Sequence, residues 1–405
     1  MGAKGLKPTL VSLFAGAGGM DIGLERAGWR TVVATDRDPG CMTTLEASKA
    51  AGVPVSDGRT HLADSMLIRA DVRDLSAADL RPMGAIRSWR PALLAGGPPC
   101  QPWSSAGLQK GLDDERGHLI NHMVRLTAEL RPRLVLFENV RGLVTAVGPN
   151  GRPGEMLTMI KNAFEEVGYA TTFATLNAAD YGAAQRRVRL YMMASERHPL
   201  PAFPQATHAR SPDPGLFEQA KPWVTLGEIL AALPEPDPED VVPATPDRER
   251  QLAPLQPGTG LRTTGRIVNN RPSGHWGYRQ DGFLADLGLP SRTIRAASTP
   301  DWIRLPNGSH RRLTWRECAA LQGFPVDWCF EGTTSSKFRQ VGNAVQVDVV
   351  EALGRALMAA WTSGLSRKRP ESMPFPAEFG RRIRYTEAEH RTNGEHRLRV
   401  RASVT

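Results

Sequence analysis

The stretch PALLAGGPPCQPWSSAG, residues 91–107, holds a cysteine where a thiol could act on a ligand. The apolar residues that open it predict a short buried strand, and the Gly-Gly-Pro-Pro sequence after them predicts a turn. Cys100 therefore follows a strand end, which is where open α/β sheets bind ligands. A lone cysteine is more often a small buried hydrophobic residue, and this interpretation suits Cys41, Cys318 and Cys329. The position of Cys100 favours catalysis.

Other side chains capable of acid or electrostatic chemistry lie on predicted strands. Glu138 is near the end of RLVLFENV, where burial would raise the pKa of its carboxyl enough for proton donation. Helix capping is the alternative role for a strand-end acid. Arg187 and Arg189, in QRRVRL, are two residues apart, so a strand would place both on one face. They could lower the pKa of a nearby thiol, or form surface ion pairs.

A glycine-rich turn near the N-terminus suggests a nucleotide-like cofactor. Residues 11–28, VSLFAGAGGMDIGLERAG, predict a strand, a turn that allows close backbone approach, and a helix whose N-terminus favours negative charge. Asp36 ends the second predicted strand and could bind ribose hydroxyls. Asp71 ends the third and could accept a hydrogen bond from an adenine amino group. Many nucleotide binders share such a turn, so a dinucleotide stays open, and both acids could cap helices.

The elements that position these residues alternate along the first half of the chain. Amphipathic segments at residues 118–130 and 154–169 predict helices between several apolar runs. This alternation favours an α/β fold with a mixed, mainly parallel sheet. The predicted strands are TLVSLFAG, RTVVATD, MLIRADV, PALLAGG, RLVLFENV, ATTFATLN and VRLYMMAS.

Composition changes along the chain predict four parts. Residues 1–195 form the catalytic α/β domain, and residues 196–330 form a smaller, loop-rich domain with a return segment, because 13 of the 32 prolines lie in residues 196–260. Helical periodicity returns in VDVVEALGRALMAAW, so residues 331–365 are expected to pack back on the first domain. Residues 366–405 show no periodic pattern and are expected to be a disordered basic tail.

Charge and cysteine content narrow the class of protein. The net charge of +9 suggests a polyanionic partner, although residues 367–405, with ten Lys/Arg and five Glu, supply +5 of it. Four scattered cysteines predict neither a disulfide framework nor a zinc site, and no metal is expected. No apolar run approaches the ~20 residues of a membrane span, and the N-terminus does not resemble a signal peptide. A cytoplasmic protein is expected.

Seven segments, in order, resemble the DNA (cytosine-5)-methyltransferase family. The resemblance covers roughly residues 9–195 and 311–350, and seven matches in the family's order are highly specific. It implies a Rossmann-like catalytic domain, and a target-recognition domain in the loop-rich part. The segments are FAGAGG, GGPPCQPWS, DDERGHL, LFENV, QRRVRLY, RRLTWRECAALQGFP and QVGNAV.

The resemblance implies S-adenosyl-L-methionine as methyl donor. Two positions depart from the family's pattern: Asp36 stands where the family commonly has Glu, and Arg37 stands where an aromatic residue often follows. The stem or guanidinium of Arg37 could cover the adenine instead. The implied cofactor-binding residues are Phe14, Gly16, Ala17, Gly18, Gly19, Asp36, Arg37, Asp71, Val72, Pro99, Asn343, Ala344 and Val345.

The resemblance also implies the chemistry. The Cys100 thiolate adds to carbon 6 of cytosine, Glu138 protonates ring nitrogen 3, and Arg189 faces the cytosine oxygen. The cytosine has to leave the duplex first, and SSAGLQKGLDDERG suits a lid over the flipped base. RPSGHWGYRQDGF, residues 271–283, holds side-chain types that bind base edges and phosphates.

Three alternatives are weighed against this interpretation. The tRNA-modifying branch of the family typically carries a Cys-Phe-Thr signature in its recognition region, and residues 196–310 contain no cysteine. A nicotinamide-dependent oxidoreductase fits only the glycine turn and Asp36. A catalytically inactive DNA-binding relative is disfavoured because the catalytic residues are present. The expected partner is double-stranded DNA, bound by a monomer in the bacterial cytoplasm, with or without a cognate restriction endonuclease.

Overall fold

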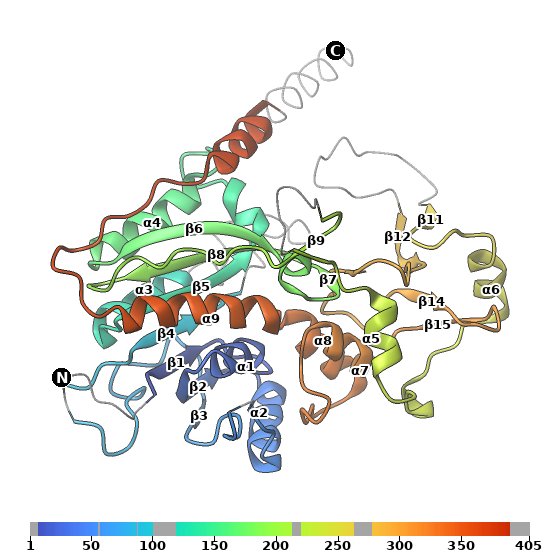
Figure 1. Cartoon of the computed structure of the whole chain (residues 1–405), viewed down its shortest axis with the longest axis horizontal. Helices are drawn as coiled ribbons and strands as arrows, with labels where there is room; N and C mark the ends of the chain where they lie inside the picture. Colours follow the sequence, from blue (N-terminus) through green and yellow to red (C-terminus); the bar gives the residue numbers. More distant parts are fainter. Residues whose placement is uncertain are drawn as a thin grey trace, which may run out of the picture.

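A seven-stranded sheet forms the centre of the molecule (Figure 1). The computed structural model describes residues 7–55, 57–86, 88–99, 119–212, 220–262 and 278–388. Five neighbouring strands are parallel, and β8 runs antiparallel between β5 and β6. The mixed, mainly parallel sheet predicted from the sequence is therefore confirmed. In spatial order the strands are β3 (Met66–Arg69), β2 (Arg30–Asp36), β1 (Thr9–Leu13), β4 (Leu93–Gly96), β5 (Leu134–Val140), β8 (Val188–Ser195) and β6 (Ala170–Asn177).

Helices cover both faces of this sheet, because its central strands are nearly continuous apolar runs whose side chains are buried on both sides. On β5, Val135 and Phe137 share a hydrophobic core with α3 (Leu119–Leu130) and α4 (Glu155–Glu166). Leu134 and Leu136 belong to the core on the other face, with α1 (Gly19–Arg26) and α9 (Val347–Thr362). The predicted helices at residues 118–130, 154–169 and 347–361 are all present. The strand ends are thereby held between two packed layers.

The C-terminal helix α9 closes the sheet against α1. The indole nitrogen of Trp29 donates a hydrogen bond to the Gly354 carbonyl oxygen at 2.9 Å. A β-carbon at Gly23 would lie 2.6 Å from the Val347 carbonyl oxygen, so the close approach of the two helices requires glycine there. Residues more than 300 positions apart in the sequence thus share one core.

Short strands and loops dominate residues 196–330, at the right of Figure 1. A small core of Leu252, Leu284 and Trp302 lies among them. The two-residue strand β7 (Gln185–Arg186) pairs with β13 and joins this region to the sheet domain. The elements are β9 (His208–Ala209), β10 (Lys221–Pro222), α5 (Leu226–Ala232), α6 (Pro246–Leu252), β11 (Gly260–Arg262), β12 (Tyr278–Phe283), β13 (Ser291–Arg292), β14 (Trp302–Arg304), β15 (His310–Arg312) and α7 (Trp315–Leu321).

The segment after α9 differs from the disordered tail that we expected. Residues 366–388 run along the outer edge of β6, where Met373 N–H donates to the Thr171 carbonyl oxygen at 2.9 Å, and residues 377–388 form a helix. Phe375 packs edge-on against Phe173, and Phe379 is only 2% exposed. The apolar side chains are too few and too irregularly spaced to form a pattern, yet they cover an exposed sheet edge. Residues 389–405 lie outside the described part.

Candidate active site

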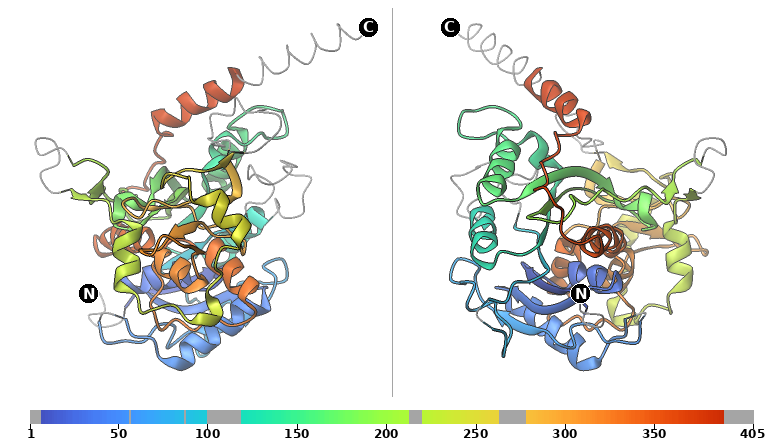
Figure 2. Two further views of the ribbon diagram at one scale, coloured as in Figure 1. Left: turned by 90° about the vertical axis from the view of Figure 1, so that its right-hand side faces the viewer. Right: turned by 60° about the vertical axis from the view of Figure 1, so that its left-hand side comes forward.

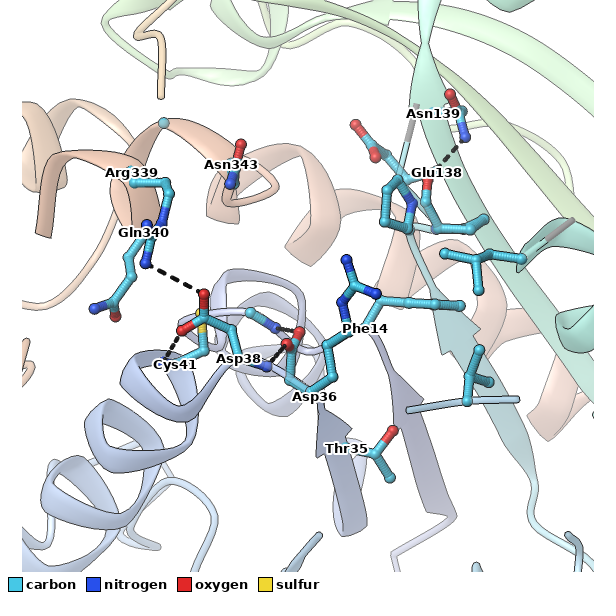
Figure 3. A pocket seen from close by; sticks show the side chains of 18 of the residues that line it. Phe14, Thr35, Asp36, Asp38, Cys41, Glu138, Asn139, Arg339, Gln340 and Asn343 are labelled. Carbon is cyan, nitrogen blue, oxygen red and sulfur yellow. Dashed lines mark hydrogen bonds and ion pairs between the residues drawn. The ribbon is translucent and has the colours of Figure 1, made fainter. Parts of the chain in front are cut away.

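A cavity of about 450 Å³ opens at the carboxyl ends of the parallel strands (Figure 3). Small-molecule sites commonly measure roughly 300–1,000 Å³ and occur at this edge of α/β sheets. One wall comes from β1 and β2, a second from β4 and β5, and a third from α8 (Thr334–Asn343). The predicted site residues that line it are Phe14, Gly16, Asp36, Arg37, Asp71, Val72, Pro99, Glu138, Arg187, Arg189 and Asn343.

The glycine turn is held open toward the cavity by Asp36. Gly16 N–H and Asp38 N–H each donate to one Asp36 carboxylate oxygen at 2.8 Å. Phe14 has φ 54°, in the left-handed region that non-glycine residues rarely adopt. A β-carbon at Gly16, where φ is +56°, would meet nothing within 4 Å. The backbone here therefore leaves space for a ligand, as a cofactor turn requires.

Asp71 lies at the outer end of the same wall and is paired with two arginines. Arg73 donates two hydrogen bonds to its carboxylate, both at 3.0 Å, and Arg37 donates one at 3.3 Å. Hydrogen bonding by Arg73 lowers the pKa of Asp71 to about 2. The carboxylate is therefore ionised at neutral pH and can accept a hydrogen bond from a ligand amino group. Arg37 therefore lies beside Asp71, and a role for it against an adenine stays a prediction.

Glu138 lies across the cavity from Asp36 (Figure 3) and is 8% exposed. Burial raises the pKa of its carboxyl, whereas the positive charge of Arg189 and, to a smaller extent, that of Arg187 lower it. Arg189 Nε is 3.4 Å from Glu138 Oε1. A β-carbon at Gly97 would lie 3.1 Å from Glu138 Oε2, so the glycine before the Pro-Pro turn makes room for this carboxyl. The environment favours retention of a proton, as proton donation requires.

Arg187 is anchored to backbone rather than aligned with Arg189 on one strand. It falls between β7 and β8, is 4% exposed, and donates hydrogen bonds to the carbonyl oxygens of Ile294, Gly342 and Ala344 at 2.9–3.3 Å. These contacts join the sheet, the loop-rich region and the end of α8. The expected continuous strand through Arg187 is wrong, and its hydrogen bonds indicate a positioning role.

The Pro-Pro turn that leads to Cys100 is also anchored. Asn139 Nδ2 donates to the Pro98 carbonyl oxygen at 3.1 Å, which ties the turn to β5. Cys100 itself, with residues 101–118, lies outside the described residues. Cys41 lines the cavity, but burial, followed by the charges of Asp36 and Asp38, raises the pKa of its thiol far above the usual range. Cys41 is therefore held as an unreactive thiol.

The remaining predicted cofactor residues lie beside the cavity rather than on its surface. Ala17 accepts a hydrogen bond from the Trp328 indole at 2.9 Å. A β-carbon at Gly18 would lie 2.8 Å from the Trp328 ring, and one at Gly19 would lie 2.5 Å from the Val345 carbonyl oxygen. Ala344 is 6% exposed. These residues pack the turn against the return segment.

Several cavity residues were missed from the sequence, among them Asp38, Arg339 and Gln340. Asp38 caps α2 (Pro39–Ala51) by accepting from Gly40 N–H and Cys41 N–H. Arg339, on α8, donates to Asp38 at 3.3 Å, and Gln340 lines the same wall. The Asp-Pro sequence at the start of α2 was an available capping signal. The contact across 301 positions could not be read from local pattern.

No group of three or more His, Cys, Asp and Glu side chains suited to a metal ion occurs in the described part of the chain. Within the same residues, no helix is both long and apolar enough to span a bilayer.

A mainly parallel sheet with acids at its strand ends around such a cavity is the arrangement in which α/β proteins bind nucleotide-like ligands. The family model "C-5 cytosine-specific DNA methylase" matches residues 9–359. The chain belongs to the C-5 cytosine-specific DNA methylase family. It is therefore a DNA (cytosine-5)-methyltransferase, which confirms the family, fold and enzyme class predicted from the sequence.

Individual relatives agree with this assignment. The chain is 32% identical over 356 residues to the Type II methyltransferase M.NgoMIV of Neisseria gonorrhoeae, covering 87% of this chain and 97% of that protein. It is 31% identical over 407 residues to M.XorII of Xanthomonas oryzae pv. oryzae, covering 90% and 87%. A crystal structure of a Spodoptera frugiperda DNMT2 mutant shares the fold, with a TM-score of 0.59, 15% identity, and coverage of 87% and 99%. Neither the tRNA-modifying nor the oxidoreductase alternative is favoured.

Proposed function

We propose that this chain methylates carbon 5 of a cytosine flipped out of a specific duplex DNA sequence, through a covalent adduct with Cys100. One observation carries the proposal. Glu138 is a buried acid with a raised pKa, 3.4 Å from the Arg189 guanidinium, and it lies against the Gly97 turn that leads directly to Cys100. A thiol and a proton donor on neighbouring strand ends are the two groups that activation of cytosine requires.

The first step forms a bond between the Cys100 sulfur and carbon 6 of cytosine. Electron density moves to the ring, and Glu138 donates its proton to nitrogen 3, so that carbon 5 becomes nucleophilic. Arg189 faces the cytosine oxygen and stabilises the Glu138 carboxylate left behind. After methylation, the proton on carbon 5 is lost to water. The ring then expels the Cys100 thiolate, and Glu138 recovers the proton from nitrogen 3.

S-adenosyl-L-methionine fits the described cavity as the methyl donor, and it supplies an electrophilic methyl group when bound. Asp36 can accept hydrogen bonds from ribose hydroxyls, and Asp71 can accept one from the adenine amino group. The open space over Gly16 allows the backbone to approach the donor closely. Phe14, Val72 and Pro99 supply apolar contacts, and Asn343 closes the third wall.

Replacement of Asp71 by alanine is expected to weaken S-adenosyl-L-methionine binding about tenfold or more, because a hydrogen bond to an ionised acceptor contributes roughly 1.5–3 kcal/mol. Titration calorimetry of the isolated protein measures this. Asp79→Ala is the matched control, since Asp79 is an exposed acid that, among the described residues, accepts hydrogen bonds from Ser76. Equal affinities for the two variants would contradict the assignment. The DNA sequence methylated should be the same in both.

The domain assignment belongs to the proposal. Residues 1–195 carry the catalytic chemistry. Residues 196–330 recognise the DNA target and include the segment that leads the chain back to the catalytic domain. Residues 331–365 complete the cofactor wall through α8 and α9. Arg187 supports this division, because one guanidinium binds carbonyl oxygens on both sides of the boundary. Of the predicted recognition segment, residues 271–277 lie outside the described part. The enzyme acts as a monomer in the cytoplasm, either beside a cognate endonuclease or alone.

Methylation of a random-sequence DNA library, followed by mapping of 5-methylcytosine, tests the function. A single short sequence should be methylated, and transfer RNA should not. Methylation of transfer RNA in place of DNA, or tight binding of a nicotinamide dinucleotide in place of S-adenosyl-L-methionine, would refute the proposal.

A further inference from the structure

The helix at residues 377–388 lies beyond residue 359, where the match to the family model ends. It is nevertheless fixed to the catalytic domain. Phe379 is 2% exposed and belongs to the same hydrophobic core as Leu143 and Val144. A β-carbon at Gly154, where φ is +83°, would lie 2.5 Å from Ile383 Cδ1, so the helix packs directly over this glycine. Figures 1 and 2 show it standing next to α4.

This packing places the helix beside the active site. The 3₁₀ helix η2 (Arg141–Thr145) begins directly after β5, whose end carries Glu138. The same β-carbon at Gly154 would lie 3.5 Å from the Val144 carbonyl oxygen, so Ile383 packs where η2 and α4 meet. Burial lowers the pKa of Arg141, and the nearby charges of Arg382 and Arg189 lower it further. Positive charge therefore extends from Arg189 through Arg141 to the helix.

The helix carries three arginines, Arg381, Arg382 and Arg384, against two glutamates, Glu378 and Glu387. Glu378 accepts a hydrogen bond from Thr175 on β6 at 2.7 Å, which turns this acid toward the sheet. Arg381 and Arg384 are exposed, and Arg382 is half-buried. Among the described residues, no carboxylate lies within ion-pair distance of these three arginines or of Arg141. Within the described part of the chain, the helix thus presents the exposed guanidinium groups of Arg381 and Arg384 without a carboxylate partner.

We propose that residues 377–388 form a DNA-contacting arm that binds phosphates of the duplex flanking the flipped cytosine. The inference rests on the proposed function, since the duplex has to lie across the cavity that Glu138 and Arg189 border. Guanidinium groups without carboxylate partners, placed beside such a site, can bind the phosphates of the duplex whatever its base sequence. The fixed core contacts of Phe379 and Ile383 distinguish this arm from a freely solvated basic tail.

The test compares two triple variants of the full chain with the same loss of charge. One carries Arg381→Ala, Arg382→Ala and Arg384→Ala; the control carries Arg355→Ala, Arg367→Ala and Lys368→Ala. Equilibrium binding is measured for a duplex containing the mapped target, with short and with long flanks, over a range of salt concentrations. The arm variant should bind the long duplex about tenfold more weakly than the control at ~0.1 M salt. Its log–log salt slope should be smaller by about 2.7, at ~0.9 for each of the three lost contacts.

The readouts separate this inference from the proposed function. Methylation at saturating DNA and the sequence methylated should be unchanged in both triple variants. If methylation persists while both variants bind both duplexes equally, the arm does not contact DNA and the inference fails. Selective loss of binding to an acidic protein, without loss of DNA affinity, would equally overturn it. Phe379→Ala, which unseats the helix, should weaken long-duplex binding as the arm variant does.

Discussion

Replacement of Glu138 by glutamine is expected to lower kcat about 10²- to 10⁴-fold, the usual contribution of a general acid. The amide keeps the shape of the side chain and can still donate a hydrogen bond, but it has no proton to transfer to nitrogen 3. S-adenosyl-L-methionine affinity should stay unchanged, because the loss lies in the transition state. Single-turnover methylation of a duplex with the mapped target measures the effect.

The pH dependence of the rate should identify Glu138 as the acid. Burial raises the pKa of this carboxyl, so the active, protonated form persists to a higher pH than an exposed glutamate allows. The rate should therefore fall as pH rises through the pKa of Glu138, and this limb should be absent from Glu138→Gln. Glu129→Gln is the control, since Glu129 is a surface acid paired with Arg125 on α3. An unchanged alkaline limb in Glu138→Gln would contradict the role.

Replacement of Cys100 by serine is expected to lower turnover on the order of 10⁴-fold or more, as loss of a catalytic nucleophile does. A serine hydroxyl ionises far less readily than a thiol, and the thiolate is the attacking species. The fold and S-adenosyl-L-methionine binding should persist, because Asn139 and Pro98 hold the preceding turn without the thiol. Calorimetry and methyl-transfer assays on the same preparation separate the two properties.

Cys329→Ser supplies the matched control for this prediction. Cys329 is half-buried in the loop after α7, and within the described part of the chain its thiol donates to the Asp327 carbonyl oxygen. Full activity is expected for Cys329→Ser. Comparable losses in the two serine variants would mean that thiol chemistry at Cys100 is not what limits the reaction.

Much of the sheet and of its strand-end chemistry could be predicted because both depend on local pattern. The seven strands are apolar runs bounded by glycine, proline or charged residues; Asp36 ends β2, and Glu138 lies two residues before Val140, the last residue of β5. Burial of Glu138 follows from its place in the central strand β5, since parallel sheets are covered on both faces. Local pattern therefore identified both acids as site candidates, and the strand order of the sheet places them on opposite sides of the cavity.

Features that depend on long-range packing could not be predicted in the same way. The period of two in a strand predicted Arg187 on the same continuous strand as Arg189. In the structure the strand is interrupted at Arg187, between β7 and β8, and its guanidinium donates hydrogen bonds to three carbonyl oxygens. The segment after residue 365 holds few apolar residues. Their packing role is apparent only in the structure, where they cover the open edge of β6. Truncation of this segment would remove Phe379 from the core, so it cannot isolate the effect of charge.

Covalent trapping on DNA that carries 5-fluorocytosine at the target position tests the central claim most directly. Fluorine at carbon 5 cannot leave as a proton, so the Cys100 adduct cannot break down after methyl transfer. We predict a denaturant-resistant protein–DNA complex that requires S-adenosyl-L-methionine, with the DNA attached to the peptide containing Cys100 when the complex is digested and analysed by mass spectrometry. Cys100→Ser should form no such complex. Trapping at another residue, or methylation of ordinary cytosine without any trapped complex, would contradict the account.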